Sequence, residues 1–295
     1  MDSVPEAFLD AVCCLLNSIE LRNLKETQGG WSVKAAIHKS KRRELKVLFD
    51  VTNHERNEIK IEFKDLNYCR DVSPTLNAKY DRIRLIEVGL FATDELPEST
   101  SMECFKKKVL PAIRSLIFEC KLTFALNKSG SENLTRIIFD SLRTSTQVTS
   151  VNTGNYGGHC LDFLKHKITV GHLSELILKG DWPADLQTAL RLFVKSPNFK
   201  ILDVGESNLT IDIYMVIAFV ERFLCGNFSQ ITDLQGRPSF PLASLKELHR
   251  DKQQLSYMTP CCTSVQWSRS NGEQLIARRH HDGDISLFVS PYIVY

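Results

Sequence analysis

A strand pattern that recurs in the second half of the chain constrains the fold more than any other sequence feature. It has the spacing L-x-x-L-x-L, and its two clear copies are Leu173, Leu176, Leu178 and Phe199, Leu202, Val204. Two weaker copies lie upstream at nearly the same offset, at Val148, Val151, Thr153 and at Leu122, Ala125. Stretches with helical spacing separate them, at 134–142, 186–193 and 213–224. One strand-helix unit leaves an apolar face that it cannot cover, so several units must stack to build a core.

Strand-helix units that recur after about 26 residues resemble leucine-rich repeats, and the resemblance implies a short solenoid. A competing interpretation is a plain α/β sheet built from βαβ crossovers, because these copies lack the Asn or Cys ladder residue usual in such repeats. Both interpretations predict parallel strands.

The N-terminal segment, as far as Trp31, has the apolar spacing of short helices. Ser3 and Glu6 have the spacing of a capping box, and Pro5 falls in the first helical turn, where proline costs little. Apolar residues occupy two neighbouring lines of this helix, namely Phe8, Val12, Leu15 and Leu9, Cys13, Leu16. The apolar arc is about 160° wide, whereas packing on a single domain needs about 100°. We therefore expect another part of the chain or another protein to cover the surplus.

Residues 1–38 resemble an F-box, a small helical module, across the following positions: Val4, Pro5, Phe8, Val12, Leu15, Leu16, Leu21, Leu24 and Trp31. The resemblance implies that these residues bind a Skp-type adaptor of a cullin ubiquitin ligase. Two features depart from the family pattern, with Glu20 where Asp is usual and Gly29-Gly30 where polar and basic residues precede the Trp. The alternative is an ordinary helical hairpin.

The order of segments also resembles divergent F-box-like proteins that are expanded in nematodes. Those proteins begin Met-Asp-Ser-Val-Pro or close to it and carry a Trp-Pro step, which here is Trp182-Pro183. This resemblance implies a substrate receptor and names no substrate.

After the N-terminal helices the apolar period changes to two, which predicts strands. A half-buried hairpin is expected from Leu45, Val47, Phe49, Val51 and Ile59, Ile61, Phe63. Residues 82–90 predict another strand with Ile83, Leu85 and Val88 facing inward, and residues 93–99 predict a linker. Thr100 and Glu103 then have capping-box spacing before a helix that runs to Leu116 and is bent by Pro111.

The C-terminal segment predicts a small antiparallel cap. Val265 and Trp267 lead into Asn271-Gly272, a strong signal for a type I′ turn, and Leu275 and Ala277 return on the other arm. Asp282-Gly283-Asp284 predicts a second turn, before a strand with Ile285, Leu287 and Val289.

These patterns together predict a mixed fold of class α+β or α/β in four segments. Their bounds are an F-box-like helical module at 1–38, a β-rich meander at 39–98, a leucine-rich-repeat-like strand-helix region at 99–230, and a β-hairpin cap at 231–295.

Charge and composition narrow the classes of partner that we expect. Thirty-seven Lys and Arg against 35 Asp and Glu leave a formal charge of +2, so neither nucleic acid nor a membrane surface is the expected partner. We find no apolar run of about 18 residues and no leader pattern. Nine cysteines, an odd number without a CxxC pair, favour reduced thiols over disulfides or zinc. We expect a cytoplasmic or nuclear protein.

No motif indicates catalysis, a cofactor or a metal. His159-Cys160 follows Gly154, Gly157 and Gly158, but we expect a flexible connection there, because adjacent side chains on a strand point apart. The run from Arg278 to His281, beside Asp282 and Asp284, is expected to be a solvated turn, and so is the basic run Lys39, Lys41, Arg42, Arg43.

We therefore expect a scaffold that is not an enzyme, which binds a Skp-type adaptor through its N-terminal helices and an unknown target protein through its repeats. One alternative is an interaction protein that has lost adaptor binding, with the apolar arc packed under its own β region. Another is a divergent enzyme with a pocket between the repeats and the C-terminal cap.

Overall fold

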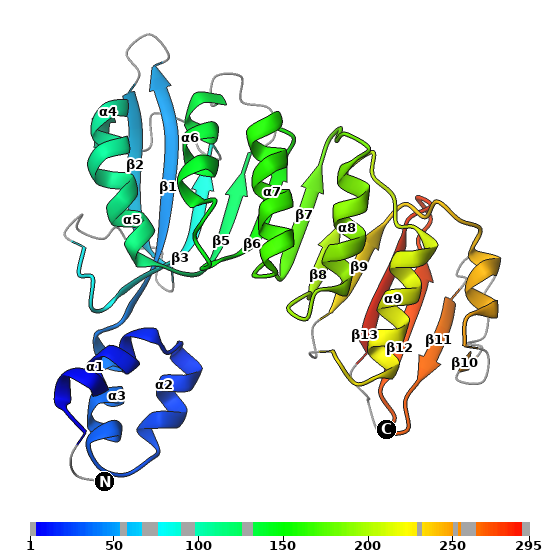
Figure 1. Ribbon diagram of the computed structural model, residues 1–295, viewed down its shortest axis with the longest axis horizontal. Coiled ribbons are helices and arrows are strands. Elements are labelled where there is room, and N and C mark those ends of the chain that lie inside the picture. Colours follow the sequence, from blue (N-terminus) through cyan, green and yellow to red (C-terminus); the bar gives the residue numbers. More distant parts are fainter. Residues whose placement is uncertain are drawn as a thin grey trace. The chain divides into compact units, whose positions relative to one another are not determined.

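The computed structural model describes residues 4–53, 58–66, 76–89, 98–125, 132–228, 232–249, 253–254 and 264–290. The chain forms two compact units, which are Met1–Glu87 with Phe91–Phe118, and Val88–Leu90 with Glu119–Tyr295 (Figure 1). Helices and strands occur in both, so the fold is mixed α/β, with parallel and antiparallel strands. The division into four segments stays a prediction.

The first unit begins with three helices, α1 (Glu6–Leu15), α2 (Ser18–Lys25) and α3 (Gly30–Lys41). Their small core consists of Cys13, Leu21 and Ala35, with Leu16 and Leu24 packed against it.

The caps of these helices differ from the prediction. Pro5 is the N-cap of α1 and no side chain caps that helix, whereas Ser3 lies outside the described residues. The capping box belongs instead to α2, where Asn17 Oδ1 accepts from the Glu20 backbone N–H and Glu20 Oε2 accepts from the Asn17 N–H. Asn17 followed three residues later by Glu20 has capping-box spacing, a signal present in the sequence that was not predicted.

The glycine pair before Trp31 has a structural reason. Gly29 is the N-cap of α3 and has φ +82°, a conformation that favours glycine. A Cβ on Gly30 would lie 3.1 Å from Leu9 Cδ1, so the missing side chain lets α3 approach α1 closely.

The strands of the first unit are β1 (Arg43–Asn53), β2 (Glu58–Asp65), β3 (Asp81–Val88) and β4 (Glu98–Ser101). The predicted hairpin is confirmed, because β1 and β2 pair antiparallel with Val47 opposite Phe63 and Phe49 opposite Ile61.

Two predictions for this region need correction. Ile86 rather than Leu85 is buried in β3, which breaks the simple alternation. Glu98 and Ser99 do not form a linker, since they lie in β4, which pairs with β2. The rest of the predicted linker, residues 93–97, lies outside the described residues.

The predicted helix to Leu116 comprises α4 (Met102–Cys104), a π-helical turn η2 (Phe105–Val109) and α5 (Leu110–Leu116). Its cap is Ser101, whose Oγ accepts from the Cys104 N–H at 3.2 Å, and not Thr100. The π turn comes just before Pro111, whose ring needs room beside the preceding turn.

In the second unit, the parallel strands are β5 (Ile117–Phe124), β6 (Val148–Gly154), β7 (Glu175–Lys179), β8 (Ile201–Asp203) and β9 (Asp233–Gly236). The helices are α6 (Glu132–Leu142), α7 (Gly158–Val170), α8 (Leu186–Lys195) and α9 (Ile213–Leu224). In Figure 1 they lie along one face of the sheet.

The register of these strands confirms the offsets between the last three copies of the strand pattern. Val151 pairs with Leu176 and Leu176 with Leu202, and all three are buried. The offset of the first copy was wrong, since Leu122 pairs with Val151 rather than Val148, and an irregularity between Cys120 and Lys121 shifts the register there.

Asparagines join neighbouring strand-helix units, although no ladder residue was expected. Asn155 Nδ2 donates to the Asp181 carbonyl at 2.7 Å. Asn208 Oδ1 accepts from the Trp182 N–H at 2.8 Å, and its Nδ2 donates to the Trp182 carbonyl at 3.0 Å. These amides pair backbone groups that the strands leave free at their ends.

Helix α7 occupies the place where a flexible connection was expected. Gly157 at its N-cap and Gly171 at its C-cap both have positive φ, +84° and +77°. Lys167 on its inner face obscured the apolar pattern, because this lysine is 2% exposed and donates to the Ser145 carbonyl.

The antiparallel cap is confirmed as β10 (Gln253–Gln254), β11 (Ser264–Ser268), β12 (Gln274–Arg279) and β13 (Ile285–Ser290), preceded by the 3₁₀ turn η3 (Leu242–Glu247). Strand β13 pairs with β9, so the cap continues the parallel sheet.

The type I′ prediction was wrong. Gly272 has φ +87° but Asn271 does not have a positive φ, and the Gly272 N–H donates to the Arg269 carbonyl. This is a longer loop with a left-handed glycine, and Gly283 with φ +94° repeats it at the next turn.

Candidate functional site

The two apolar lines of α1 have different surroundings. Leu9 and Cys13 are buried and Leu16 packs on the same small core. On the other line, Phe8 is 54% exposed and Leu15 is 74% exposed, while Val12 is half-buried. The second line is therefore the part of the apolar arc of α1 that the small core does not use. Part of this line lies at the surface of the first unit.

The nine residues of the F-box-like pattern divide in the same way. Those exposed are Val4, Pro5, Phe8 and Leu15; those half-buried are Val12, Leu16, Leu24 and Trp31. Leu21 is fully buried, so its side chain supports the three helices from inside and does not reach their surface.

Two further apolar residues are exposed on these helices, Ile19 at 64% and Val33 at 61%, and neither was among the predicted site residues. The ring of Phe8 meets that of Trp31 edge to face, with centroids 6.2 Å apart. We call Val4, Phe8, Leu15, Ile19 and Val33 the exposed apolar set. A contiguous exposed apolar patch commonly marks a contact surface.

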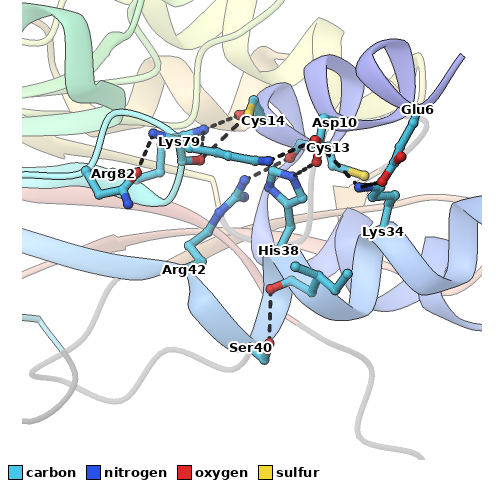
Figure 2. A network of polar contacts seen from close by, with 12 residues as sticks. Glu6, Asp10, Cys13, Cys14, Lys34, His38, Ser40, Arg42, Lys79 and Arg82 are labelled. Atoms are coloured by element: carbon cyan, nitrogen blue, oxygen red, sulfur yellow. Dashed lines mark hydrogen bonds and ion pairs between the residues drawn. The ribbon is translucent and has the colours of Figure 1, made fainter.

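Asp10 is the centre of a polar network that joins α1, α3 and the segment before β3 (Figure 2). Its carboxylate lies 3.0 Å from His38 Nε2 and accepts from Lys79 Nζ at 2.8 Å. Lys34 lies 3.6 Å away and also pairs with Glu6. The hydrogen bonds from Lys79 and then His38 lower the pKa of Asp10 to about 2, so it is ionised at neutral pH.

His38 is fully buried, and burial lowers its pKa although Asp10 opposes this. A neutral imidazole therefore donates from Nε2 to Asp10. Among the described residues, Nδ1 finds no hydrogen-bond partner. The Tyr80 ring packs beside it at 5.2 Å between centroids.

Two arginines hold the C-terminal end of α1. Arg42 donates to the Cys13 carbonyl at 2.8 Å and to the Leu16 carbonyl, and Arg82 of β3 donates to the Cys14 carbonyl at 2.7 Å (Figure 2). These carbonyls have no intrahelical partner, and cations stabilise this end of a helix dipole. The contacts fasten α1 to β3 and make the three helices a fixed platform.

The prediction that the basic run forms a solvated turn is correct for only half of its four residues. Lys39 and Lys41 are exposed, but Arg42 caps α1 and Arg43 binds the buried Asp81 through two hydrogen bonds of 2.7 Å. Both arginines of the run are therefore held by contacts within the chain.

The His159-Cys160 pair does not form a dyad. Cys160 is fully buried, with Sγ 3.6 Å from the Gly154 carbonyl, and burial raises its pKa to about 12. His159 is exposed and lies 3.0 Å from Asp140.

At the turn after β12, His280 Nε2 lies 2.8 Å from Ser286 Oγ and Arg278 lies over the Phe288 ring. In the described part of the chain, no three His, Cys, Asp or Glu side chains are placed to hold a metal ion.

A cavity of about 390 Å³ lies in the first unit, between β2, β4 and the helix that follows. Its lining is mostly apolar, including Ile61, Phe63 and Ile113, and Lys108 is its one ionisable residue. It offers no acid-base pair, and it is not the pocket expected for a divergent enzyme between the repeats and the cap.

Neither a protein-family model nor a curated protein matches this chain. Within the ranges that the structure describes, no helix has the length and apolar character needed to cross a membrane. The candidate site is the exposed apolar set, because these side chains lie at the surface of the three helices that the Asp10 network and the two arginines hold in place.

Proposed function

We propose that this protein is a substrate receptor of a cullin-type ubiquitin ligase, with an F-box-like module that binds a Skp-type adaptor. A target protein would bind the leucine-rich-repeat-like strand-helix region, in the cytoplasm or the nucleus. The observation that carries the proposal is the exposure of Phe8 and Leu15 on the helix whose neighbouring apolar line fills the module core. Chemistry would then belong to other subunits.

The energetics are adequate for docking. Burial of three side chains such as Phe8, Leu15 and Val4 contributes on the order of 5 kcal/mol before the costs of association. The ties from α1 to Lys79 and Arg82 keep these side chains in place before binding, which reduces the entropy that docking must overcome.

The decisive experiment is co-purification of the full chain with a purified Skp-type adaptor. Phe8→Asp combined with Leu15→Asp should weaken binding by about 100-fold or more, because two anchors become charged. Leu192→Asp is the matched control, since Leu192 on α8 is 60% exposed and should tolerate the change. Leu16→Asp is unsuitable, because Leu16 packs on the core and its loss would unfold the module.

If neither the wild-type chain nor Leu192→Asp binds the adaptor, a second candidate function is favoured. That candidate is an interaction protein that keeps the architecture without the adaptor. The half-burial of Val12 and Trp31 within the chain itself is the observation that favours it.

A further inference from the structure

The cavity of the first unit lies between a sheet and one side of a helix. Strand β2 contributes Ile61 and Phe63, which lie on the same face of the strand and are both buried. Strand β2 and α5 lie side by side in Figure 1. The helix contributes two pairs of residues one turn apart, which are Lys108 with Ala112 and Val109 with Ile113.

Short side chains keep this space open. Ala112 on α5 lines the cavity, and so do Ser99 and Thr100 on β4. The volume of about 390 Å³ falls within the roughly 300–1,000 Å³ of pockets that bind small molecules. Water needs two or more polar partners to settle in such a space, so a mostly apolar lining favours an apolar ligand over ordered water.

The polar groups that line the cavity are hydrogen-bond donors without partners. Among the described residues, the Lys108 side chain forms no ion pair and no hydrogen bond, and the same is true of the Ser99 and Thr100 hydroxyls. The preceding lysine differs, because Lys107 pairs with Glu103 at 2.7 Å. An anionic group at the border of the cavity would therefore meet an uncompensated positive charge.

We propose that this cavity binds a small aliphatic carboxylate. The hydrocarbon chain would lie against Ile61, Phe63 and Ile113, which removes apolar surface from water. The carboxylate would lie beside Lys108, which attracts its charge and can donate hydrogen bonds to it. The inference goes beyond the proposed function, since no member of the exposed apolar set lines the cavity.

Isothermal titration calorimetry of the full chain with hexanoate, octanoate and octan-1-ol tests the proposal. Octanoate should bind at least about tenfold more tightly than hexanoate, because each buried methylene strengthens binding about fourfold. Lys108→Met should weaken octanoate binding about threefold, the effect of a solvent-exposed charge pair, without weakening octan-1-ol. Lys106→Met is the matched control and should leave octanoate unchanged, since Lys106 is an exposed lysine of the same π turn outside the cavity.

A second variant tests the place of the hydrocarbon chain. Ala112 is exposed, so Ala112→Phe should leave the fold intact while its ring occupies the cavity. Binding of octanoate and of octan-1-ol should both fall by at least about tenfold, because the chain loses its apolar contacts. Ser115→Phe is the control, since Ser115 is exposed on the same helix and does not line the cavity.

Equal affinity for hexanoate and octanoate, or no binding of either, would overturn the inference. So would an equal loss on Lys106→Met, which would indicate only general attraction to basic side chains, or an equal loss of octan-1-ol on Lys108→Met. Full octanoate binding by Ala112→Phe would also contradict it. Phe8→Asp with Leu15→Asp should bind octanoate as the wild-type chain does, so the adaptor proposal and this one fail separately.

Discussion

At the scale of single residues, Asp10 shows how a surface helix is anchored. It lies one turn after Glu6 on α1, and its partners come from α3 and from the segment before β3. The exposed apolar set depends on this anchor, because α1 carries Phe8 and Leu15 on its outer side.

The depressed pKa of Asp10 predicts an acid-sensitive fold. Because the folded value of about 2 is below the ordinary value of 3.8, the stabilisation is present above pH 4 and is lost as pH falls towards 2. Chemical unfolding of the full chain across this range should show the decline in the free energy of unfolding, and Asp10→Asn should flatten it. Lys79→Met should flatten it in part, since Lys79 is the main cause of the shift. An unchanged slope in Asp10→Asn would contradict the assignment.

At the scale of elements, the residues that contact or form the helix ends determine where each helix begins and ends. Helix α1 ends on arginines that come from the C-cap of α3 and from β3, and α7 begins and ends on left-handed glycines. Neither device belongs to the apolar pattern that predicts a helix.

Removing a capping arginine should loosen α1. Arg82→Met leaves the Cys14 carbonyl without its donor, and Arg82 is only 7% exposed, so the free energy of unfolding should fall by about 2 kcal/mol. Arg22→Met on the exposed side of α2 should change it by less than about 0.5 kcal/mol. Denaturant titration measures both, and equal values for the two variants would refute the role of Arg82.

Neighbouring glycines before α7 offer a matched pair. Gly157→Ala should destabilise by about 1 kcal/mol, because its φ is +84°. Gly158→Ala should be neutral or stabilise by about 0.5 kcal/mol, because a Cβ there meets nothing within 4 Å. Thermal unfolding of both variants measures the difference, and the reverse order would contradict the backbone assignment.

At the scale of the whole molecule, each unit has a core of its own. The second unit is built on a line of buried residues across its parallel strands, including Val151, Leu176, Leu202 and Leu234. This line does for the second unit what Cys13, Leu21 and Ala35 do for the three helices of the first.

Truncation within that line should be costly. Leu202→Ala creates a cavity among fully buried neighbours, so we expect a loss of about 2–5 kcal/mol in the free energy of unfolding. Leu192→Ala, on the exposed side of α8, should cost less than about 0.5 kcal/mol. A small effect of Leu202→Ala, measured by denaturant titration, would show that the strand register is wrong.

Local patterns were sufficient for much of the fold. The alternation of Val47 and Phe49 correctly predicted a strand, because burial of one face of a strand places an apolar residue at every second position. The spacing of Leu176 and Leu202 correctly predicted that these residues pair on neighbouring strands. Helix α7 was missed because Lys167 occupies an inner position, and the C-terminal turn was misassigned because one dipeptide suits more than one loop.

The candidate site was less accessible to sequence reasoning. The two apolar lines of α1 were recognised, but which one faces outward depends on how three helices pack, and so does the exposure of Ile19 and Val33. Arg82 reaches Cys14 across 68 positions of the chain. Ile61 and Ile113 line one cavity only because segments distant in sequence lie together.

The amino-acid sequence by itself determined the periods of its helices and strands, since these depend on neighbours along the chain. The tertiary structure alone decided which apolar line lies at the surface, which arginines cap α1 and which side chains line the cavity. Those outcomes depend on contacts between distant segments, and local side-chain spacing carries no information about such contacts.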